Sequence, residues 1–127
     1  MKEYSIQFDD LIGVPFEKKG RGPKTYDCYG LVMECFRRRG IEIPSFESPD
    51  GAGKIIATFG TQIPIWKEVE KQKGTAVVIK LPFMMHVGYM VSDTEMIHCW
   101  ERSYGVLVEP IDVWKRKVVG YYEYEPS

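Results

Sequence analysis

The sequence predicts an α+β domain, with N-terminal helices packed on a C-terminal antiparallel β-sheet or meander. Before residue 60, apolar residues recur at helical spacing, whereas after Gly74 the chain changes to short segments rich in β-branched and aromatic residues. The length of 127 residues suits a single hydrophobic core. We therefore expect one domain that spans residues 1–127.

The first expected element is a short helix near the N-terminus, which Gly13 and Pro15 should end. Its apolar residues, at helical spacing, are Tyr4, Phe8, Leu11 and Ile12. Residues 17–25, EKKGRGPKT, then have the Gly, Pro and charge content of a loop. Its four basic residues favour a solvated loop over a contact with an anionic polymer.

The next helix is expected from Asp27 to Gly40. Asp27 is a good N-cap, and Gly40 suits the position just after a helix. Arginines at 37–39 suit the negative end of the helix dipole. The apolar stripe comprises Cys28, Leu31, Val32, Cys35 and Phe36.

A further helix is expected from Asp50 to Gly60, and strands follow Gly74. The predicted strand segments are AVVIKL, HVGYMV, EMIHCW, GVLVEPI and VVGYYEY. Turn signals or charged residues separate them, which favours an antiparallel arrangement.

Composition argues against several classes of function. Lys and Arg total 17 against 18 acidic residues, so a general nucleic-acid binder is not expected. The apolar runs are too short to span a membrane. Three cysteines without a CxxC pair fit a reducing compartment. The N-terminus has no apolar signal-peptide core, so we expect synthesis in the cytoplasm without a signal peptide.

Cys28 is the candidate nucleophile because it follows the Asp27 cap at the start of a helix. Unpaired N–H groups and the positive end of the dipole at that position favour a thiolate, so we expect a depressed pKa for this thiol. Gly30 leaves room for another group to approach the backbone. Cys35 lies two turns further along the same face and is interpreted as core packing.

The two histidines, His86 and His98, lie in neighbouring predicted strands and supply a candidate base. They share a face of the sheet only if the residue numbers of two directly opposite residues add up to an even number. This holds, for example, when Val91 lies opposite Glu95 across a three-residue turn. His86 would then face Trp100, with His98 as its diagonal neighbour, and we expect both histidines to point toward Cys28. Cys99 would point to the opposite face.

The motifs DCYGLV, HVGYMV and MIHCW, in this order and spacing, resemble the NlpC family of bacterial cell-wall cysteine peptidases. The upstream LIGVPFEKKGRGP and the later GIEIP are similar to that family as well. The resemblance covers roughly Leu11 to Tyr122 and implies a papain-like fold. DCYGLV is most similar to members carried by tailed phages and prophages.

The resemblance implies the following roles. Cys28 is the nucleophile, His86 is its base, and His98 orients the His86 imidazole. The Cys28 backbone N–H helps to bind the oxyanion. Asp27 resembles the residue near the free amino terminus of the substrate, and Trp100 is the best candidate for lining the site. No cofactor or metal is implied.

The implied reaction is hydrolysis of the bond between γ-D-glutamate and the diamino acid of peptidoglycan stem peptides. Many members have Ser at the position of Tyr29 and Tyr at the position of Phe16, so substrate preference and activity depend on these two departures. Other phage tail proteins are the implied partners, and assembly into a phage tail that acts at the cell wall is the implied location.

Two other interpretations remain open. A catalytically silent tail assembly or structural module could use the same fold, since fold does not fix function. Zinc binding is the second, with ligands drawn from Cys28, Cys35, His86, His98 and Cys99. Their spacing matches no compact structural zinc pattern.

Overall fold

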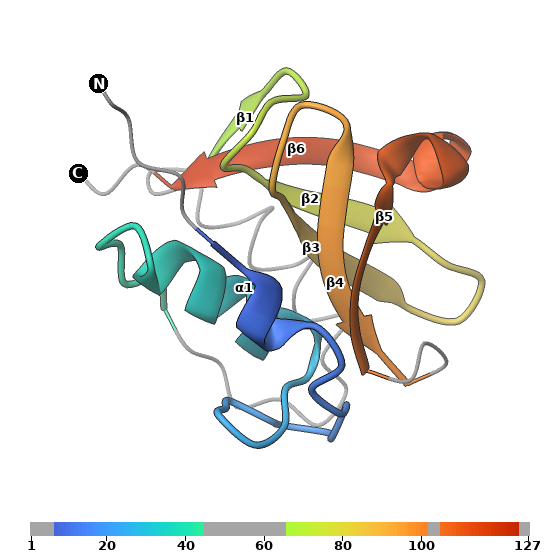
Figure 1. Cartoon of the computed structure of the whole chain (residues 1–127). Helices are drawn as coiled ribbons and strands as arrows, with labels where there is room; N and C mark the ends of the chain where they lie inside the picture. Colours follow the sequence, from blue (N-terminus) through green and yellow to red (C-terminus); the bar gives the residue numbers. More distant parts are fainter. Residues whose placement is uncertain (1–6, 45–65, 102–104, 125–127) are drawn as a thin grey trace.

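A computed structural model describes residues 7–44, 66–101 and 105–124 (Figure 1). The expected helix from Asp50 to Gly60 lies outside the described residues. None of the helices in the described ranges is long and apolar enough to cross a membrane.

In the part of the chain that the structure describes, six antiparallel strands form one sheet in the order β1-β6-β2-β3-β4-β5. The strands are β1 (Trp66–Val69), β2 (Ala76–Lys80), β3 (Met85–Met90), β4 (Glu95–Trp100), β5 (Gly105–Pro110) and β6 (Val118–Tyr124). All five predicted strand segments are confirmed. The sequence missed β1, a four-residue strand with two charged residues in its centre.

The predicted meander holds for β2 to β5 and is wrong for β6. The 3-10 helix η2 (Ile111–Lys117) follows β5 directly, and the chain then returns across the sheet to pair with β2 and β1. Residue alternation within a strand gives its two faces but not its neighbours, so this crossover could not be derived from the pattern.

The capped helix is confirmed as α1 (Cys28–Arg37). All five residues of the predicted apolar stripe are buried. Gly40 has a φ of 82°, in the left-handed region that glycine adopts without strain, and the chain leaves the helix there.

Among residues 7–12, which the structure describes, the first predicted helix is a single 3-10 turn, η1 (Asp9–Leu11). The earlier part of that prediction, with Tyr4, lies outside the described residues. The Gly13 N–H donates to the Val106 carbonyl, and the Val106 N–H donates to the Val14 carbonyl. This pairing with the edge of β5 begins at Gly13, where the sequence predicted that the helix would end.

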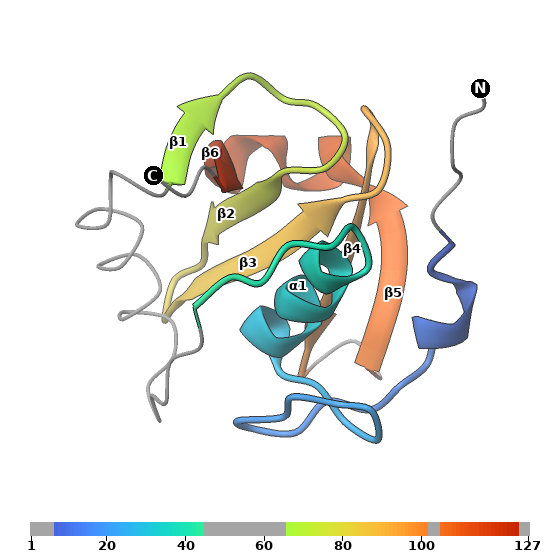
Figure 2. The same ribbon diagram turned by 90° about the vertical axis from the view of Figure 1, so that its left-hand side faces the viewer.

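The sheet lies between α1 and η2 (Figure 1). Helix α1 packs across one face, against odd-numbered positions of β3 and β4 such as Val87 and Cys99 (Figure 2). The opposite face forms a second cluster of Val77, Ile79, Met90, Met96 and Ile111, with Trp114 of η2 packed on it. Even-numbered positions of β3 and β4 face this second cluster.

Candidate active site

Cys28 occupies the first position of α1 and its residue is 8% exposed. The carboxylate of Asp27 caps the helix by accepting a hydrogen bond of 2.6 Å from the Gly30 N–H. The same carboxylate oxygen accepts a hydrogen bond of 2.8 Å from Arg21 Nη1. The predicted N-cap is confirmed, and it holds an ion pair that the sequence did not predict.

Gly30 allows a close approach of the preceding loop. A Cβ at this position would lie 2.1 Å from the carbonyl oxygen of Gly20. That carbonyl accepts hydrogen bonds from the Asp27 N–H at 3.1 Å and from Arg21 Nη1 at 3.1 Å. The group that Gly30 makes room for is therefore the loop backbone, which fixes the entry of the chain into α1.

The strand register required for a histidine pair is confirmed. Tyr89 pairs with Ile97 and Met90 with Met96, so paired positions sum to an even number. The Val91 N–H donates to the Glu95 carbonyl at 3.0 Å and closes the predicted three-residue turn. The shared face is the even-numbered one that packs toward η2, whereas α1 and Cys28 pack on the other face, so the predicted orientation toward Cys28 is not confirmed.

A continuous hydrogen-bonded chain runs through the two histidines. Nε2 of His86 lies 2.8 Å from Nδ1 of His98, and Nε2 of His98 lies 2.6 Å from Oε2 of Glu109. The same Glu109 oxygen accepts a hydrogen bond of 3.0 Å from Nε1 of Trp114. Three strands and η2 thus contribute to one polar chain.

Aromatic rings enclose this pair, and both histidine residues have an exposed fraction of 0%. The His86 ring centroid lies 5.7 Å from that of Trp100 and 6.4 Å from that of Trp114. Burial lowers the pKa of His86 to about 3, and a charge on His98 would lower it further. Burial also lowers the pKa of His98, against the effect of its Glu109 partner. Both shifts favour a neutral imidazole at pH 7.

The thiol of Cys28 lies next to β3, at the position that follows His86. The backbone N–H of Val87 is among the groups that hydrogen-bond the thiol. The Met90 N–H donates to Thr75 on the β2 side, so by alternation the Val87 N–H points toward β4. Pairing between β3 and β4 stops at Tyr89 and Ile97, which leaves the Val87 N–H available to Cys28.

Nδ1 of His86 is the other polar group of this region. It is buried and makes no hydrogen bond within the described part of the chain. His86 Nε2 is already directed at His98, so Nδ1 is the ring nitrogen that remains for a thiol or a substrate.

The predicted depressed pKa of Cys28 is wrong for this structure. Burial raises the pKa to about 12, and the charge of Asp27 raises it as well. Hydrogen bonds from the backbone N–H groups of Val87, Tyr29 and Cys28 favour the thiolate but do not reverse the shift. In the resting state the Cys28 thiol and the His86 imidazole are therefore both neutral.

The remaining predicted residues have different surroundings. The Trp100 ring is tilted against both histidine rings, with centroid distances of 5.7 Å to His86 and 6.5 Å to His98. Tyr29 is buried and its hydroxyl donates to the Pro44 carbonyl at 2.5 Å. Phe16 is partly buried against the core that contains Cys28.

The other two cysteines have the packing positions that the sequence predicted. Cys35 is fully buried within the α1 core. Cys99 points away from His98, and its thiol donates to the Tyr26 carbonyl at 3.3 Å.

No group of three or more His, Cys, Asp or Glu side chains in the described ranges is placed to hold a metal ion, so the zinc interpretation gains no support there.

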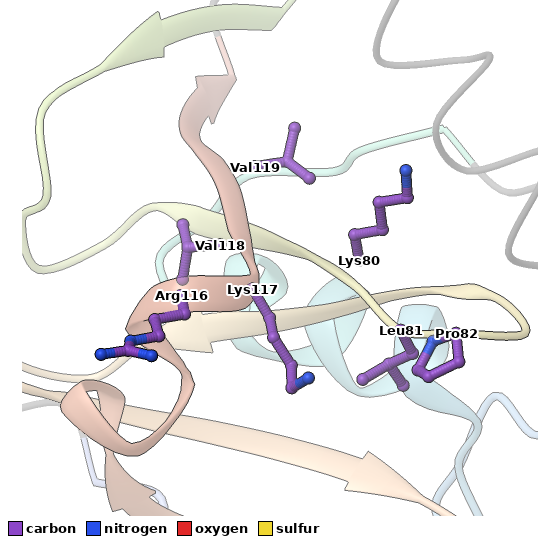
Figure 3. Close-up of a pocket in the computed structure, with 7 residues that line it drawn as sticks. All are labelled: Lys80, Leu81, Pro82, Arg116, Lys117, Val118 and Val119. Carbon is purple, nitrogen blue, oxygen red and sulfur yellow. The ribbon is translucent and has the colours of Figure 1, made fainter.

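A shallow hollow of about 390 Å³ lies between the β2–β3 turn and the η2–β6 junction (Figure 3). None of the predicted site residues lines it. Its cations Lys80, Arg116 and Lys117 point in different directions, so they do not converge on one anion (Figure 3).

Sequence reasoning missed Glu109, Trp114 and Arg21. Glu109 is an acidic residue inside the apolar segment GVLVEP, and that position was a usable signal. His98 pairs with Leu107, so Glu109 is its diagonal neighbour on the same face. The contact of Trp114 depends on the path of η2, for which the sequence held no signal.

Comparisons with known proteins agree with this architecture. The model of the NlpC/P60 family matches residues 13–123. No protein of curated function matches the sequence.

Two solved structures are similar. An NlpC/P60 family protein from Bacillus cereus ATCC 10987 has a TM-score of 0.64 and 23% identity, over 93% of this chain and 40% of that chain. The NlpC/p60 domain of the peptidoglycan hydrolase SagA has a TM-score of 0.59 and 18% identity, over 87% of each chain. The present chain thus spans less than half the length of the B. cereus protein, and at these identities the likeness is one of fold.

Proposed function

The chain belongs to the NlpC/P60 family, and on that premise we propose that it is a cysteine peptidase of peptidoglycan stem peptides. One observation carries the proposal. The thiol of Cys28, at a capped helix start, lies beside the strand position that follows His86, and His86 is bonded to His98. These three residues occupy the positions that match the motifs of the family.

The proposed reaction begins with transfer of the Cys28 thiol proton to Nδ1 of His86 while Sγ attacks the carbonyl carbon of the peptide. The Cys28 backbone N–H, in the first turn of α1 and so without a helical acceptor, stabilises the resulting oxyanion. The C–N bond breaks as His86 returns the proton to the leaving amine. Water then hydrolyses the thioester and regenerates the thiol.

The neutral resting pair makes this a general-base mechanism. With the thiol pKa near 12 and the imidazole pKa near 3, a preformed ion pair is not the ground state of the free protein. Proton transfer therefore accompanies attack, and bound substrate must bring the thiol and Nδ1 into contact.

The proposed bond is the one between γ-D-glutamate and the diamino acid, with Asp27 near the free amino terminus of the substrate. Arg21 already pairs with Asp27, so an incoming amine would share that carboxylate with the guanidinium. Phe16, Tyr29 and Trp100 are the proposed walls of the substrate site. We place the activity in a phage or prophage tail, on the resemblance of the DCYGLV motif.

The second candidate is a catalytically silent tail module. It is favoured by the small exposure of Cys28, by its raised pKa, and by a His86 Nδ1 that makes no hydrogen bond with the thiol. The two candidates differ in one measurable property, which is turnover of a peptide substrate.

The test uses synthetic stem peptides with and without a free amino terminus, incubated with wild-type protein, Cys28→Ala and Cys35→Ala. Cys35 is the matched control because it is a buried thiol of the same helix. The proposal expects cleavage by the wild type and by the Cys35 variant, and none by the Cys28 variant. Equal residual cleavage by both variants, or none by any protein, would favour the silent module.

A further inference from the structure

We propose that Glu109 is a positioning residue that fixes the tautomers of both histidines and leaves an unprotonated Nδ1 on His86; its catalytic part rests on the peptidase function proposed above. Glu109 lies on β5, outside the three motifs that suggested the nucleophile and its base. It contacts His98 and Trp114 directly, and acts on His86 only through His98.

The first step concerns His98. A carboxylate has no proton to donate, so the 2.6 Å contact requires that Nε2 of His98 carries the proton and donates to Oε2 of Glu109. Burial lowers the pKa of His98 below its ordinary value, which favours the neutral imidazole at pH 7. A neutral imidazole has one N–H, so Nδ1 of His98 is left as a lone-pair acceptor.

The second step concerns His86. Nδ1 of His98 can only accept, so the 2.8 Å contact requires that Nε2 of His86 carries the proton. His86 is neutral as well, and its Nδ1 therefore holds a lone pair. This is the same atom that is buried without a hydrogen-bond partner. One carboxylate, two residues away in the hydrogen-bonded chain, thus sets which nitrogen of His86 can act as a base.

The third step concerns charge. When His86 takes the thiol proton it becomes a cation enclosed by Trp100 and Trp114, where an uncompensated charge is costly. The titratable groups linked to it by hydrogen bonds are His98 of β4 and, beyond His98, Glu109 of β5. Of these two groups, only the Glu109 carboxylate is an anion, and it can stabilise the His86 cation through the hydrogen bonds of His98.

Trp114 completes the arrangement. Its Nε1–H donates to the same Oε2 that accepts from His98, so that oxygen is held by two donors from different elements. The indole therefore fixes the rotamer of Glu109 while its ring packs against His98, with a centroid distance of 5.6 Å. The Glu109 carboxylate is therefore held more firmly than the carboxylate of an ordinary surface ion pair.

The first test is independent of turnover. The imidazole nitrogens of the full chain are assigned by ¹⁵N NMR in wild type, Glu109→Gln, Glu109→Leu and Glu95→Gln. The amide oxygen of Gln can still accept both N–H groups, so Glu109→Gln should keep the tautomers and shift the His98 Nε2–H resonance upfield. Glu109→Leu should leave His86 as a mixture of tautomers. Glu95→Gln changes the same charge at an exposed position of β4 and should match the wild type.

The second test is kinetic. Loss of a hydrogen bond to a charged group corresponds to a fall of about 10- to 100-fold in kcat for Glu109→Leu, with KM nearly unchanged. Glu109→Gln should fall between that variant and the wild type, because orientation remains and charge is lost.

Wild-type NMR spectra with Nδ1 of His86 protonated would overturn the proposal, and so would tautomers and kcat that are unchanged in both Glu109 variants. If the Leu variant does not fold, the Gln variant decides: an unmoved His98 resonance would also overturn it. A wild-type protein with the stated tautomers but no turnover would contradict the peptidase function and leave the assignment of tautomers standing.

Discussion

Acidification should destabilise this protein through its buried histidines. The pKa of His86 is lowered by burial to about 3, whereas an unfolded histidine has a pKa of about 6.5. Between these values the unfolded chain binds a proton that the folded chain does not. The free energy of unfolding therefore falls as pH falls, beginning near pH 6.5.

The magnitude follows from the width of that window. Each pH unit costs about 1.4 kcal/mol per proton, so the 2.5 units from pH 6.5 to pH 4 remove roughly 3 kcal/mol through His86. The lowered pKa of His98 acts in the same direction. A domain of this size has a total stability on the order of 5–15 kcal/mol, so the loss is readily measurable.

The assay is urea unfolding at half-unit steps from pH 7.5 to pH 4, with wild type, His86→Gln and Glu95→Gln. The His86 variant should be less stable at pH 7. The slope of its free energy of unfolding against pH should correspond to about one fewer proton taken up on unfolding than in the wild type. Glu95→Gln should retain the wild-type slope between pH 5 and pH 7. A wild-type stability that is flat over this range, or a slope unchanged in His86→Gln, would refute the assignment of a buried neutral imidazole.

Three further predictions follow from the same contacts. Alkylation by iodoacetamide should be faster at Cys28 than at the fully buried Cys35 and Cys99. Because burial raises the Cys28 pKa to about 12, the alkylation rate of Cys28 should keep rising above pH 8. A fast rate that is already constant at neutral pH would instead indicate a preformed ion pair with His86. Gly30→Ala should destabilise the protein by about 2 kcal/mol or more in urea unfolding, because the new Cβ meets the Gly20 carbonyl at 2.1 Å. The control Arg37→Ala, on the exposed side of the same helix, should cost under about 1 kcal/mol. Phe16→Tyr, which restores the hydroxyl that many family members carry, should raise turnover of stem peptides if the substrate site is that of the family, and unchanged kcat and KM would mean that the substrate is positioned differently.

The features that local sequence determines were predictable. The Asp27 cap, the buried stripe of α1 and the end of the helix at Gly40 depend on residues within a few positions of one another. The histidine register was also predictable, because strand alternation and a three-residue turn leave few alternatives.

The features that depend on distant packing were not predictable. Gly13 and Val14 pair with the edge of β5, and the return of β6 to β2 follows from the path of η2. The raised pKa of Cys28 has the same origin. A helix N-terminus favours the thiolate, but the sequence did not reveal how completely the sheet would bury the sulfur.

The most direct test of the central claim is digestion of purified peptidoglycan sacculi, with the released fragments identified by mass spectrometry. The account predicts that wild-type protein releases peptides whose new amino terminus is the diamino acid and whose partner fragments end in D-glutamate. It also predicts that Cys28→Ala releases none. Intact sacculi from several peptidoglycan chemotypes, together with stem peptides that the wild-type protein leaves uncut, would contradict it.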